Sequence, residues 1–407
     1  MKITLTATCL FGLERLLGEE IEQLGYDRVE TIDGRITYRG DEEAIALSNV
    51  FLRYAERVFI NLGRFSADTF DALFEGTKAL PWETWIGRDD AFPVKGHSIK
   101  SKLFSIPDCQ RIVKRAVVDR LSSVYGLTRF PETGVTYQIE FFILKDEATL
   151  MIDTSGDPLH KRGYRPEANA APIRETLAAA IAAISRPREE VLFWDPMCGS
   201  GTIAIEAAMM MKHIAPGANR RFAAERFPAI PRSVWAAARE EARDGIAETK
   251  FEVYASDIDP EAVSLTKENA RRAGVADLIR AFEADARRIS APGRRGTVVT
   301  NPPYGERMLT APEVETLYRE LGRHFRSLAP WQVYIISSVQ NFEALYGKRA
   351  DKTRKLYNGM IPCVLYQYFK NEKSDERIRH RTENKKDYCK SVGAFFFVLI
   401  SRIANCI

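Results

Sequence analysis

The sequence predicts an α/β protein whose C-terminal half is a doubly wound, mostly parallel sheet, preceded by a smaller α+β region. Three observations lead to this fold class. Short apolar strand patterns alternate with helical patterns between residues 191 and 337, as in a parallel sheet covered by helices. A glycine-rich turn follows the first of these strands. Asn358-Gly359 then separates two final strand patterns, at 352–357 and 361–369, and indicates an antiparallel hairpin.

Length and composition are those of a globular chain with more than one domain. The chain has 407 residues, 45% of them hydrophobic and 28% charged, so two or three domains with sizeable cores are expected. The net charge of +4 is compatible with a nucleic-acid partner. The 6 cysteines are scattered and indicate neither a zinc site nor a disulfide framework. Without a signal-peptide core or a run of about 20 apolar residues, we expect a cytoplasmic enzyme with no metal ion and no membrane partner.

Residues 1–65 predict a module of alternating strands and helices. Asp33-Gly34 lies between two strand patterns and is a hairpin signal. The pattern order β-α-β-β-α-β is ferredoxin-like. The sequence leaves open whether this module is structural or contacts a ligand. Its strand patterns are 3–8, 29–32, 35–38 and 57–62, and its helical patterns are 13–24 and 42–49.

Residues 66–155 predict a second α+β domain with a basic surface. Helical patterns occupy 68–79 and 108–124, and strand patterns occupy 98–102 and 136–143. Between residues 93 and 129 there are 8 Lys/Arg and only 2 Asp/Glu. Such a charge run is either a solvated helix face or a surface that contacts phosphates. The residues that concentrate the charge are Lys95, Lys100, Lys102, Arg111, Lys114 and Arg115.

Three further segments connect or follow the domains. Residues 156–172 form a linker with turn signals and a basic cluster that includes Arg162 and Arg165. Residues 212–248 contain three prolines and form a longer connection inside the C-terminal domain. Residues 371–407 are charged and then briefly apolar, and we expect this tail to be disordered.

Residues 173–370 carry the alternating pattern. A helical pattern at 173–184 precedes the first strand. The strand patterns are 191–194, 251–256, 280–284, 297–300 and 332–337, and the other helical patterns include 203–211, 260–273 and 314–327. Because the carboxyl ends of parallel strands meet at one edge of a sheet, the residues that follow these strands are the candidates for a ligand site.

The first strand ends in Asp195 and a glycine-rich turn. Gly199 and Gly201 allow positive φ and close approach of the backbone to a ligand, and the helix that follows presents its first N–H groups to that ligand. This is a nucleotide-type site. The spacing fits the dinucleotide fingerprint only weakly. The Gly-Lys-Ser/Thr of a phosphate loop is absent.

Acidic residues also follow the second and third strands. Asp257 is placed to accept hydrogen bonds from a ribose diol, whereas Asp259 suits the cap of the next helix as well as a ligand contact. Asp285 follows the third strand and is either a ligand contact or a helix cap. Cys198 is more consistent with a small packed residue than with a nucleophile.

The strand at 297–300 ends in Asn301-Pro302-Pro303-Tyr304, a motif suited to methylation of an exocyclic base amine. Such an amine is a poor nucleophile because its lone pair is delocalised into the ring. The side-chain oxygen of Asn301 and the carbonyl of Pro302 can accept from its N–H bonds and favour a pyramidal nitrogen. The prolines stiffen the loop, and Tyr304 can stack on a base withdrawn from its helix. The alternative is a β-turn without a chemical role.

Together these motifs resemble class I S-adenosylmethionine-dependent RNA methyltransferases that carry an N-terminal THUMP domain. The likeness is strongest to the bacterial large-subunit (23S) ribosomal RNA guanine-N2 methyltransferases of the RlmL type, and it covers most of residues 1–370. It implies a Rossmann-like class I methyltransferase domain, a parallel sheet with a terminal antiparallel hairpin, preceded by a ferredoxin-like module and a THUMP domain. The residues that carry it are Asp195–Gly201, Asn301–Arg307, Lys161–Arg165, Arg174–Leu177 and Leu356–Gly359.

The resemblance implies a cofactor, a substrate and a set of site residues. S-adenosylmethionine is the expected cofactor, and the N2 amine of a guanine in large-subunit ribosomal RNA is the expected target. A transfer RNA guanine methyltransferase, a DNA adenine methyltransferase and a non-catalytic RNA-binding protein remain alternatives. The residues expected to hold the cofactor are Asp195, Cys198, Gly199, Ser200, Gly201, Asp257, Asp259, Asp285, Arg174 and Thr176. Those expected to contact RNA are Lys95, Lys100, Lys102, Arg111, Lys114, Arg115, Arg162 and Arg165.

Overall fold

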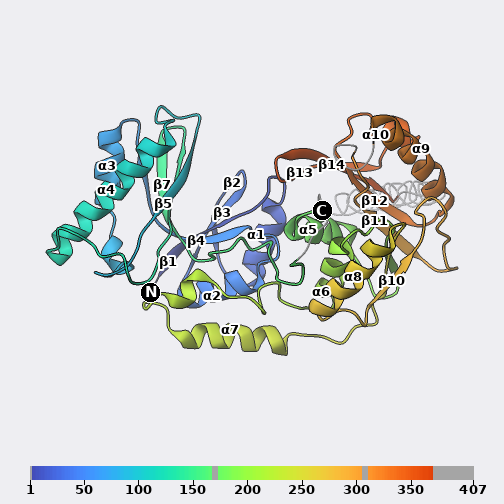
Figure 1. Cartoon of the computed structure of the whole chain (residues 1–407), viewed down its shortest axis with the longest axis horizontal. Coiled ribbons are helices and arrows are strands. Elements are labelled where there is room, and N and C mark those ends of the chain that lie inside the picture. The colour runs from blue at the N-terminus through green and yellow to red at the C-terminus, as the bar shows by residue number, and fades with distance from the viewer. Residues whose placement is uncertain (1, 167–172, 305–309, 370–407) are drawn as a thin grey trace, which may run out of the picture.

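The described part of the chain contains two seven-stranded sheets, one in each half of the molecule (Figure 1). The structure is a computed structural model and describes residues 2–166, 173–304 and 310–369. The strand order is β2-β3-β1-β4-β7-β6-β5 in the N-terminal sheet and β10-β9-β8-β11-β12-β14-β13 in the C-terminal sheet. The tail, 371–407, and part of the linker lie outside the described residues.

The first module has the predicted order of elements. Its helix α1 buries Leu17 and Ile21 against the sheet, and the side chain of Asp41 caps α2 by accepting from the Ala44 amide. Gly34 turns the β2–β3 hairpin at φ +71°. The elements are β1 (Ile3–Thr8), α1 (Glu14–Gln23), β2 (Arg28–Ile32), β3 (Arg35–Gly40), α2 (Glu42–Phe51) and β4 (Arg57–Ser66).

The second module continues the same sheet, because β7 pairs with β4 in antiparallel register. Its first strand in chain order, β5, lies at 94–99, so the predicted strand at 98–102 was misplaced, and β7 was not predicted. Parallel pairing with β6 aligns Val94 with Ile139 and overrides the weak strand propensity of this polar, glycine-containing stretch. The elements are α3 (Phe70–Lys78), η1 (Trp82–Thr84), β5 (Val94–Ile99), α4 (Ile106–Tyr125), β6 (Ile139–Leu144) and β7 (Glu147–Asp153).

The C-terminal sheet confirms the predicted fold class. Strands β10, β9, β8, β11 and β12 run parallel, and the β13–β14 hairpin adds to the β12 edge in antiparallel register. The strands are β8 (Leu192–Asp195), β9 (Val253–Asp257), β10 (Ile279–Glu283), β11 (Gly296–Thr300), β12 (Gln332–Ser337), β13 (Lys352–Asn358) and β14 (Ile361–Tyr368). The helices are α5 (Glu175–Ser185), α6 (Thr202–Met211), α8 (Pro260–Arg272), α9 (Ala311–Ser327) and α10 (Phe342–Tyr346).

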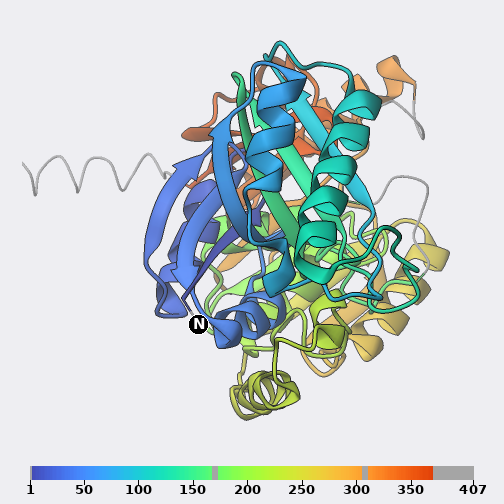
Figure 2. The ribbon, with the colours of Figure 1, turned by 90° about the vertical axis from the view of Figure 1, so that its left-hand side faces the viewer.

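The long connection after α6 leaves its own domain and packs on the N-terminal half. It contains η2 (Ala223–Arg226) and α7 (Arg232–Asp244), and α7 packs against α2. The Gly217 amide donates to the Val50 carbonyl at 2.8 Å, and the Phe227 ring stacks on Tyr137 with 4.2 Å between centroids. In Figure 2 this helix lies end-on at the bottom, beneath the N-terminal strands. The segment therefore ties the two halves together.

Candidate active site

The carboxyl ends of the parallel strands open into one cleft of about 920 Å³. This volume suits a nucleotide-sized ligand. The loops after β8, β9, β10 and β11 all contribute to its walls, and the turn of the β13–β14 hairpin closes one side. Of the residues expected to hold a cofactor or act on a substrate, those that line the cleft are Asp195, Cys198, Gly199, Ser200, Asp257, Asp259, Asp285, Arg174, Asn301, Pro302, Pro303 and Tyr304.

The glycine loop after β8 is held by contacts that only small residues allow. Gly199 and Gly201 have φ of +53° and +80°, a region that favours glycine. Gly201 does not line the cleft. A Cβ at this position would lie 2.8 Å from Cγ2 of Thr266 in α8, so the absence of a side chain lets α8 pack beneath the loop. The Gly199 amide donates to Oδ2 of Asp257 at 2.9 Å, which ties the loop to the end of β9.

Asp195 is a buried acid at the end of β8. Its side chain is 1% exposed, and Oδ1 accepts from the Met197 amide at 3.3 Å. Burial raises the pKa of Asp195 to about 7, and the nearby Asp257 carboxylate adds to the effect. A cationic ligand group beside it would favour the ionised form, and the ammonium of S-adenosylmethionine is such a group.

The carboxylates of Asp259 and Asp285 already accept hydrogen bonds from groups within the protein. Asp259 caps α8 by accepting from the Glu261 amide at 2.9 Å, as the alternative interpretation expected, although it still borders the cleft. Both oxygens of Asp285 accept from the Arg287 guanidinium at 2.8 to 3.0 Å. Hydrogen bonding to Arg287 lowers the pKa of Asp285, so this carboxylate stays ionised and a ligand must share it with the arginine.

The Asn-Pro-Pro-Tyr loop is positioned from both sides. The Tyr304 hydroxyl donates to Oδ1 of Asn301, so the oxygen expected to orient an amine is itself oriented by the tyrosine. Tyr318 of α9 is fully buried, and its hydroxyl donates to the Pro303 carbonyl at 3.1 Å while contacting the Ser337 hydroxyl at 3.0 Å. Tyr318 was not among the predicted site residues, because in the sequence it is one apolar position of a helix.

Two smaller predicted residues have packing roles. The Cys198 thiol contacts the Thr266 hydroxyl at 3.5 Å, and burial raises the pKa of Cys198 well above its usual value, so the thiol is not poised as a nucleophile. The Ser200 hydroxyl lies 3.1 Å from that of Thr202 at the start of α6. Both side chains border the cleft from within the loop.

Thr176, which was expected to hold the cofactor, lies outside the cleft in the structure. Thr176 is fully buried. Its hydroxyl donates to Oε1 of Glu56, in the N-terminal module, at 2.5 Å. Arg174 does reach the cleft, and its guanidinium also donates to Oε2 of Glu56 at 3.0 Å. These contacts join the first turn of α5 to the N-terminal half.

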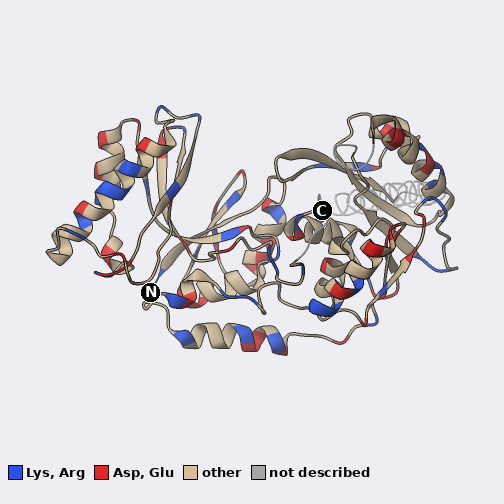
Figure 3. Cartoon of the chain, viewed as in Figure 1, with Lys and Arg blue, Asp and Glu red and all other residues tan. Residues whose placement is uncertain are grey.

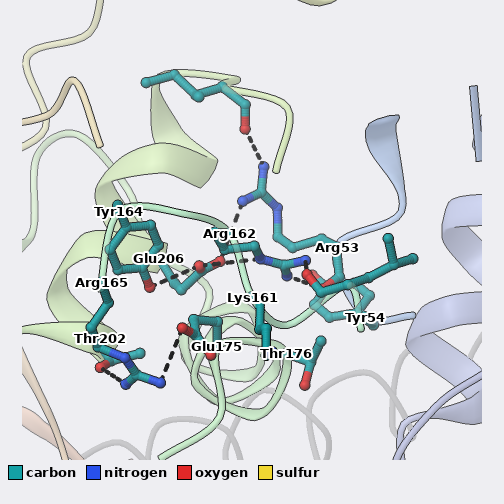
Figure 4. A network of polar contacts seen from close by, with 12 residues as sticks. Arg53, Tyr54, Lys161, Arg162, Tyr164, Arg165, Glu175, Thr176, Thr202 and Glu206 are labelled. Atoms are coloured by element: carbon teal, nitrogen blue, oxygen red, sulfur yellow. Dashed lines mark hydrogen bonds and ion pairs between the residues drawn. The ribbon is translucent and has the colours of Figure 1, made fainter. Parts of the chain in front are cut away.

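Arg162 and Arg165, which were expected to contact RNA, lie in a polar network with acidic partners (Figure 4), where Arg162 is buried and Arg165 partly buried. Arg162 lies 3.5 Å from the fully buried Glu206 of α6, which also accepts from the Tyr164 hydroxyl at 3.1 Å and lies 3.6 Å from Arg53. Arg165 pairs with Glu175 at 3.0 Å and donates to the Thr202 hydroxyl at 2.7 Å. Arg162, which also donates to the Arg53 carbonyl, therefore joins the two halves, whereas Arg165 holds the linker on the C-terminal half.

The basic residues of the second module lie on β5, on α4 and in the loop between them. Figure 3 marks Lys and Arg positions in blue along the ribbon of α4. Lys102 pairs with Asp68 at 2.9 Å, and Arg111 and Lys114 pair with Asp108 and Glu132. The residues of this set for which the described part of the chain offers no ion-pair partner are Lys95, Lys100 and Arg115.

Other cleft residues had no distinctive sequence signal. Ile258, next to Asp257, is 62% exposed and lines the cleft, where it offers an apolar surface to a flat ring. Arg287 bridges Asp285 and Glu320 at the same end. Within the described ranges no cluster of three or more His, Cys, Asp or Glu side chains could hold a metal ion, and no described helix is long and apolar enough to cross a membrane.

A doubly wound sheet with a terminal hairpin, a glycine loop and an Asn-Pro-Pro-Tyr loop in one cleft defines a class I methyltransferase. Family models give the specific assignment. Residues 162–367 match "RMKL-like, methyltransferase domain", residues 4–59 match "RlmL ferredoxin-like domain" and residues 67–153 match "THUMP domain". The chain belongs to this family of methyltransferases.

Known relatives agree with this assignment. A putative RNA methyltransferase, YpsC, from Bacillus subtilis is 43% identical over 94% of the chain and 99% of its own length. The ribosomal RNA large subunit methyltransferase K/L of Psychromonas ingrahamii is 34% identical over 88% of the chain, which spans 49% of that longer protein. SMU.472, a putative methyltransferase solved in complex with SAH, is 39% identical, covers 91% of this chain and 99% of its own, and superposes with a TM-score of 0.85.

S-adenosylmethionine is the cofactor, because SAH is this molecule without its methyl group and is bound by that similar structure. The cleft fits it. Its lining offers a buried acid at Asp195, a second carboxylate at Asp257 and a glycine loop whose backbone a ligand can approach, and these groups suit an ammonium and a ribose diol.

Proposed function

We propose that the protein methylates the exocyclic N2 amine of a guanine in large-subunit ribosomal RNA. The observation that carries this proposal is that Asn301-Pro302-Pro303-Tyr304 and the glycine loop line the same cleft. An amine held by the first loop therefore faces a cofactor held by the second. The THUMP domain and the name of the K/L relative favour ribosomal RNA as the substrate.

The side chains supply alignment and charge stabilisation. S-adenosylmethionine supplies the methyl group when bound. Oδ1 of Asn301 and the Pro302 carbonyl accept from the two N–H bonds of the target amine and direct its lone pair into the cleft. Tyr318 fixes the neighbouring Pro303 carbonyl, which keeps the loop in place. Catalysis on this scheme comes from orientation and preorganised dipoles, and no covalent enzyme intermediate forms.

The Tyr304 ring is proposed to stack on the withdrawn base, while its hydroxyl holds Asn301. Tyr304→Ala is expected to lower both RNA capture and methyl transfer, because stacking contributes roughly 1–3 kcal/mol per base. Tyr304→Phe keeps the ring and is expected to retain most RNA affinity, with a smaller loss of rate from the freed Asn301 amide. Single-turnover rates and RNA dissociation constants measure both effects. Equal behaviour of the two variants would contradict stacking.

The proposed ion pair between Asp195 and the cofactor ammonium predicts a pH-dependent affinity. In the free protein Asp195 has a pKa of about 7, so below that pH it is protonated and must lose a proton to pair. The affinity for S-adenosylmethionine should therefore fall by about tenfold for each pH unit below 7. Calorimetry across this range measures it. Asp195→Asn should bind more weakly at high pH and lose this dependence, and a wild-type profile in the variant would exclude the pair.

The experiment that tests the function is methyl transfer from labelled S-adenosylmethionine into total RNA, followed by nucleoside analysis. N2-methylguanosine in the large-subunit fraction is the expected product. The same product in transfer RNA would favour the transfer RNA alternative, and N6-methyladenine in a parallel DNA sample would favour the DNA enzyme. A protein that binds RNA and cofactor without transfer would be a non-catalytic RNA-binding protein. The basic residues of β5 and α4 are proposed to add RNA affinity in each RNA case.

A further inference from the structure

A second large cavity lies where the long connection passes the N-terminal sheet. It has a volume of about 1130 Å³, and it shares no lining residue with the catalytic cleft. β5 and β6 form one wall, and η2 with the start of α7 forms the other. The two walls come from separate parts of the chain, and the packing of α7 on α2 fixes their separation.

The lining of this cavity is basic. Three of its four acidic residues are in ion pairs: Asp153 pairs with Arg57, Glu225 with Arg239 at 2.7 Å, and Asp157 with Lys161 at 3.5 Å. Burial raises the pKa of the fourth, Glu140, and the charge of nearby Arg35 acts in the opposite direction. The basic residues in the lining are Arg57, Lys95, Arg221, Arg226, Arg232 and Arg239.

Four of these cations have no acidic partner in the described part of the chain. Lys95 lies on one wall, and Arg221, Arg226 and Arg232 lie on the other, all with exposed side chains. Cations that face each other across a cavity repel unless an anion lies between them. Arginine guanidinium groups suit phosphate oxygens because they can donate two hydrogen bonds in parallel. The arrangement is that of an anion site with several contact points.

The aromatic lining gives a second, independent observation. Trp235 of α7 is 3% exposed and stacks on Phe222, with 5.5 Å between ring centroids. Its indole N–H finds no acceptor among the described residues. A buried donor without an acceptor costs free energy. A ligand rich in acceptor oxygens would supply the missing hydrogen bond.

We propose that this cavity binds the sugar-phosphate backbone of the RNA substrate, at a site separate from the catalytic cleft. The proposal rests on the proposed function, in which RNA is the substrate. Four cations without acidic partners carry more positive charge than one phosphate can balance. The successive phosphates of an RNA strand would balance it. Such contacts position an RNA without reading its sequence. The long connection would then contribute to substrate binding as well as to domain packing.

The test compares two triple variants of the full chain that remove equal charge. Arg221→Gln, Arg226→Gln and Arg232→Gln alter the cavity. Lys267→Gln, Arg323→Gln and Arg349→Gln remove three exposed cations of the catalytic domain that have no acidic partner among the described residues and line neither cavity. The probe is fluorescein-labelled large-subunit ribosomal RNA, and its affinity is measured by anisotropy over a range of salt concentrations. Cofactor affinity and thermal unfolding check that each variant folds.

The cavity variant should bind RNA more weakly than the control, with a log–log salt slope shallower by about 2 to 3, since each lost phosphate contact removes about 0.7–0.9. Equal affinities and slopes in the two variants would overturn the proposal. Thermal stabilisation of only the wild type by inorganic phosphate, with RNA binding intact in the cavity variant, would make this a small-anion site and also overturn it. A cavity-specific loss of RNA affinity in a protein that transfers no methyl group would support the RNA site and count against the proposed function alone.

Discussion

Asn301→Ala is expected to lower the single-turnover rate of methyl transfer by roughly two to three orders of magnitude, the usual effect of removing one preorganised polar group. The amide oxygen of Asn301 is proposed to accept from the amine more strongly as its nitrogen becomes tetrahedral. The loss should therefore appear in the transition state and not in binding. Rapid-quench assays with saturating RNA and cofactor measure it.

Binding assays separate this effect from damage to the site. The cofactor should bind Asn301→Ala nearly as it binds the wild type, because Asp195 and Asp257 lie on other strand ends, and RNA affinity should change only a few-fold. Asn301→Asp keeps an acceptor oxygen at the same position and should recover part of the rate. A wild-type single-turnover rate for Asn301→Ala would exclude the proposed role and require another amine-orienting group.

Glu206→Gln is expected to destabilise the protein by about 3–5 kcal/mol, because removing one partner of a buried ion pair leaves an uncompensated charge. Glu206 is fully buried between Arg53 and Arg162 and also accepts from Tyr164. Glutamine keeps the shape but not the negative charge. The two arginines would then face each other in the interface between the N-terminal half and α6. Denaturant unfolding followed by intrinsic fluorescence measures the loss.

Glu268→Gln provides the matched control. Glu268 pairs with Arg272 four residues later on the exposed face of α8, and exposed pairs of this kind contribute about 0–1 kcal/mol. If Glu206→Gln unfolds at the same denaturant concentration as Glu268→Gln, the buried arginines are balanced by other groups and Glu206 is not the centre of the network.

The fold of the C-terminal half and the composition of its cleft follow largely from local sequence. Apolar strand patterns and the Asn358-Gly359 turn predict the parallel sheet and its antiparallel hairpin, which the structure confirms. Once the strands are parallel, geometry brings the residues that follow them to one edge. For that reason Asp195, Asp257 and Asn301, widely separated in the sequence, are found in one cleft.

The residues whose places differ from the sequence-based expectations share a physical cause, because their places depend on contacts outside the local pattern. Arg162 and Arg165 carry the same charge as solvated linker residues, and Glu206 and Glu175 compensate that charge. Thr176 was expected at the cofactor but bonds Glu56 of another module. The strand β5 contains glycine and polar residues, and its position is set by pairing with β6.

By itself the sequence determined which residues end the strands, because a strand, its turn and the helix that follows are encoded within about twenty neighbouring residues. Only the tertiary structure decided which charged side chains are buried and which stay exposed to solvent. Glu206, the partner of Arg162, comes from a helix far away along the chain, and no local pattern records this pair. The same packing of α7 against the N-terminal half created the basic cavity beside β5, since its two walls exist as a site only when the two halves are joined.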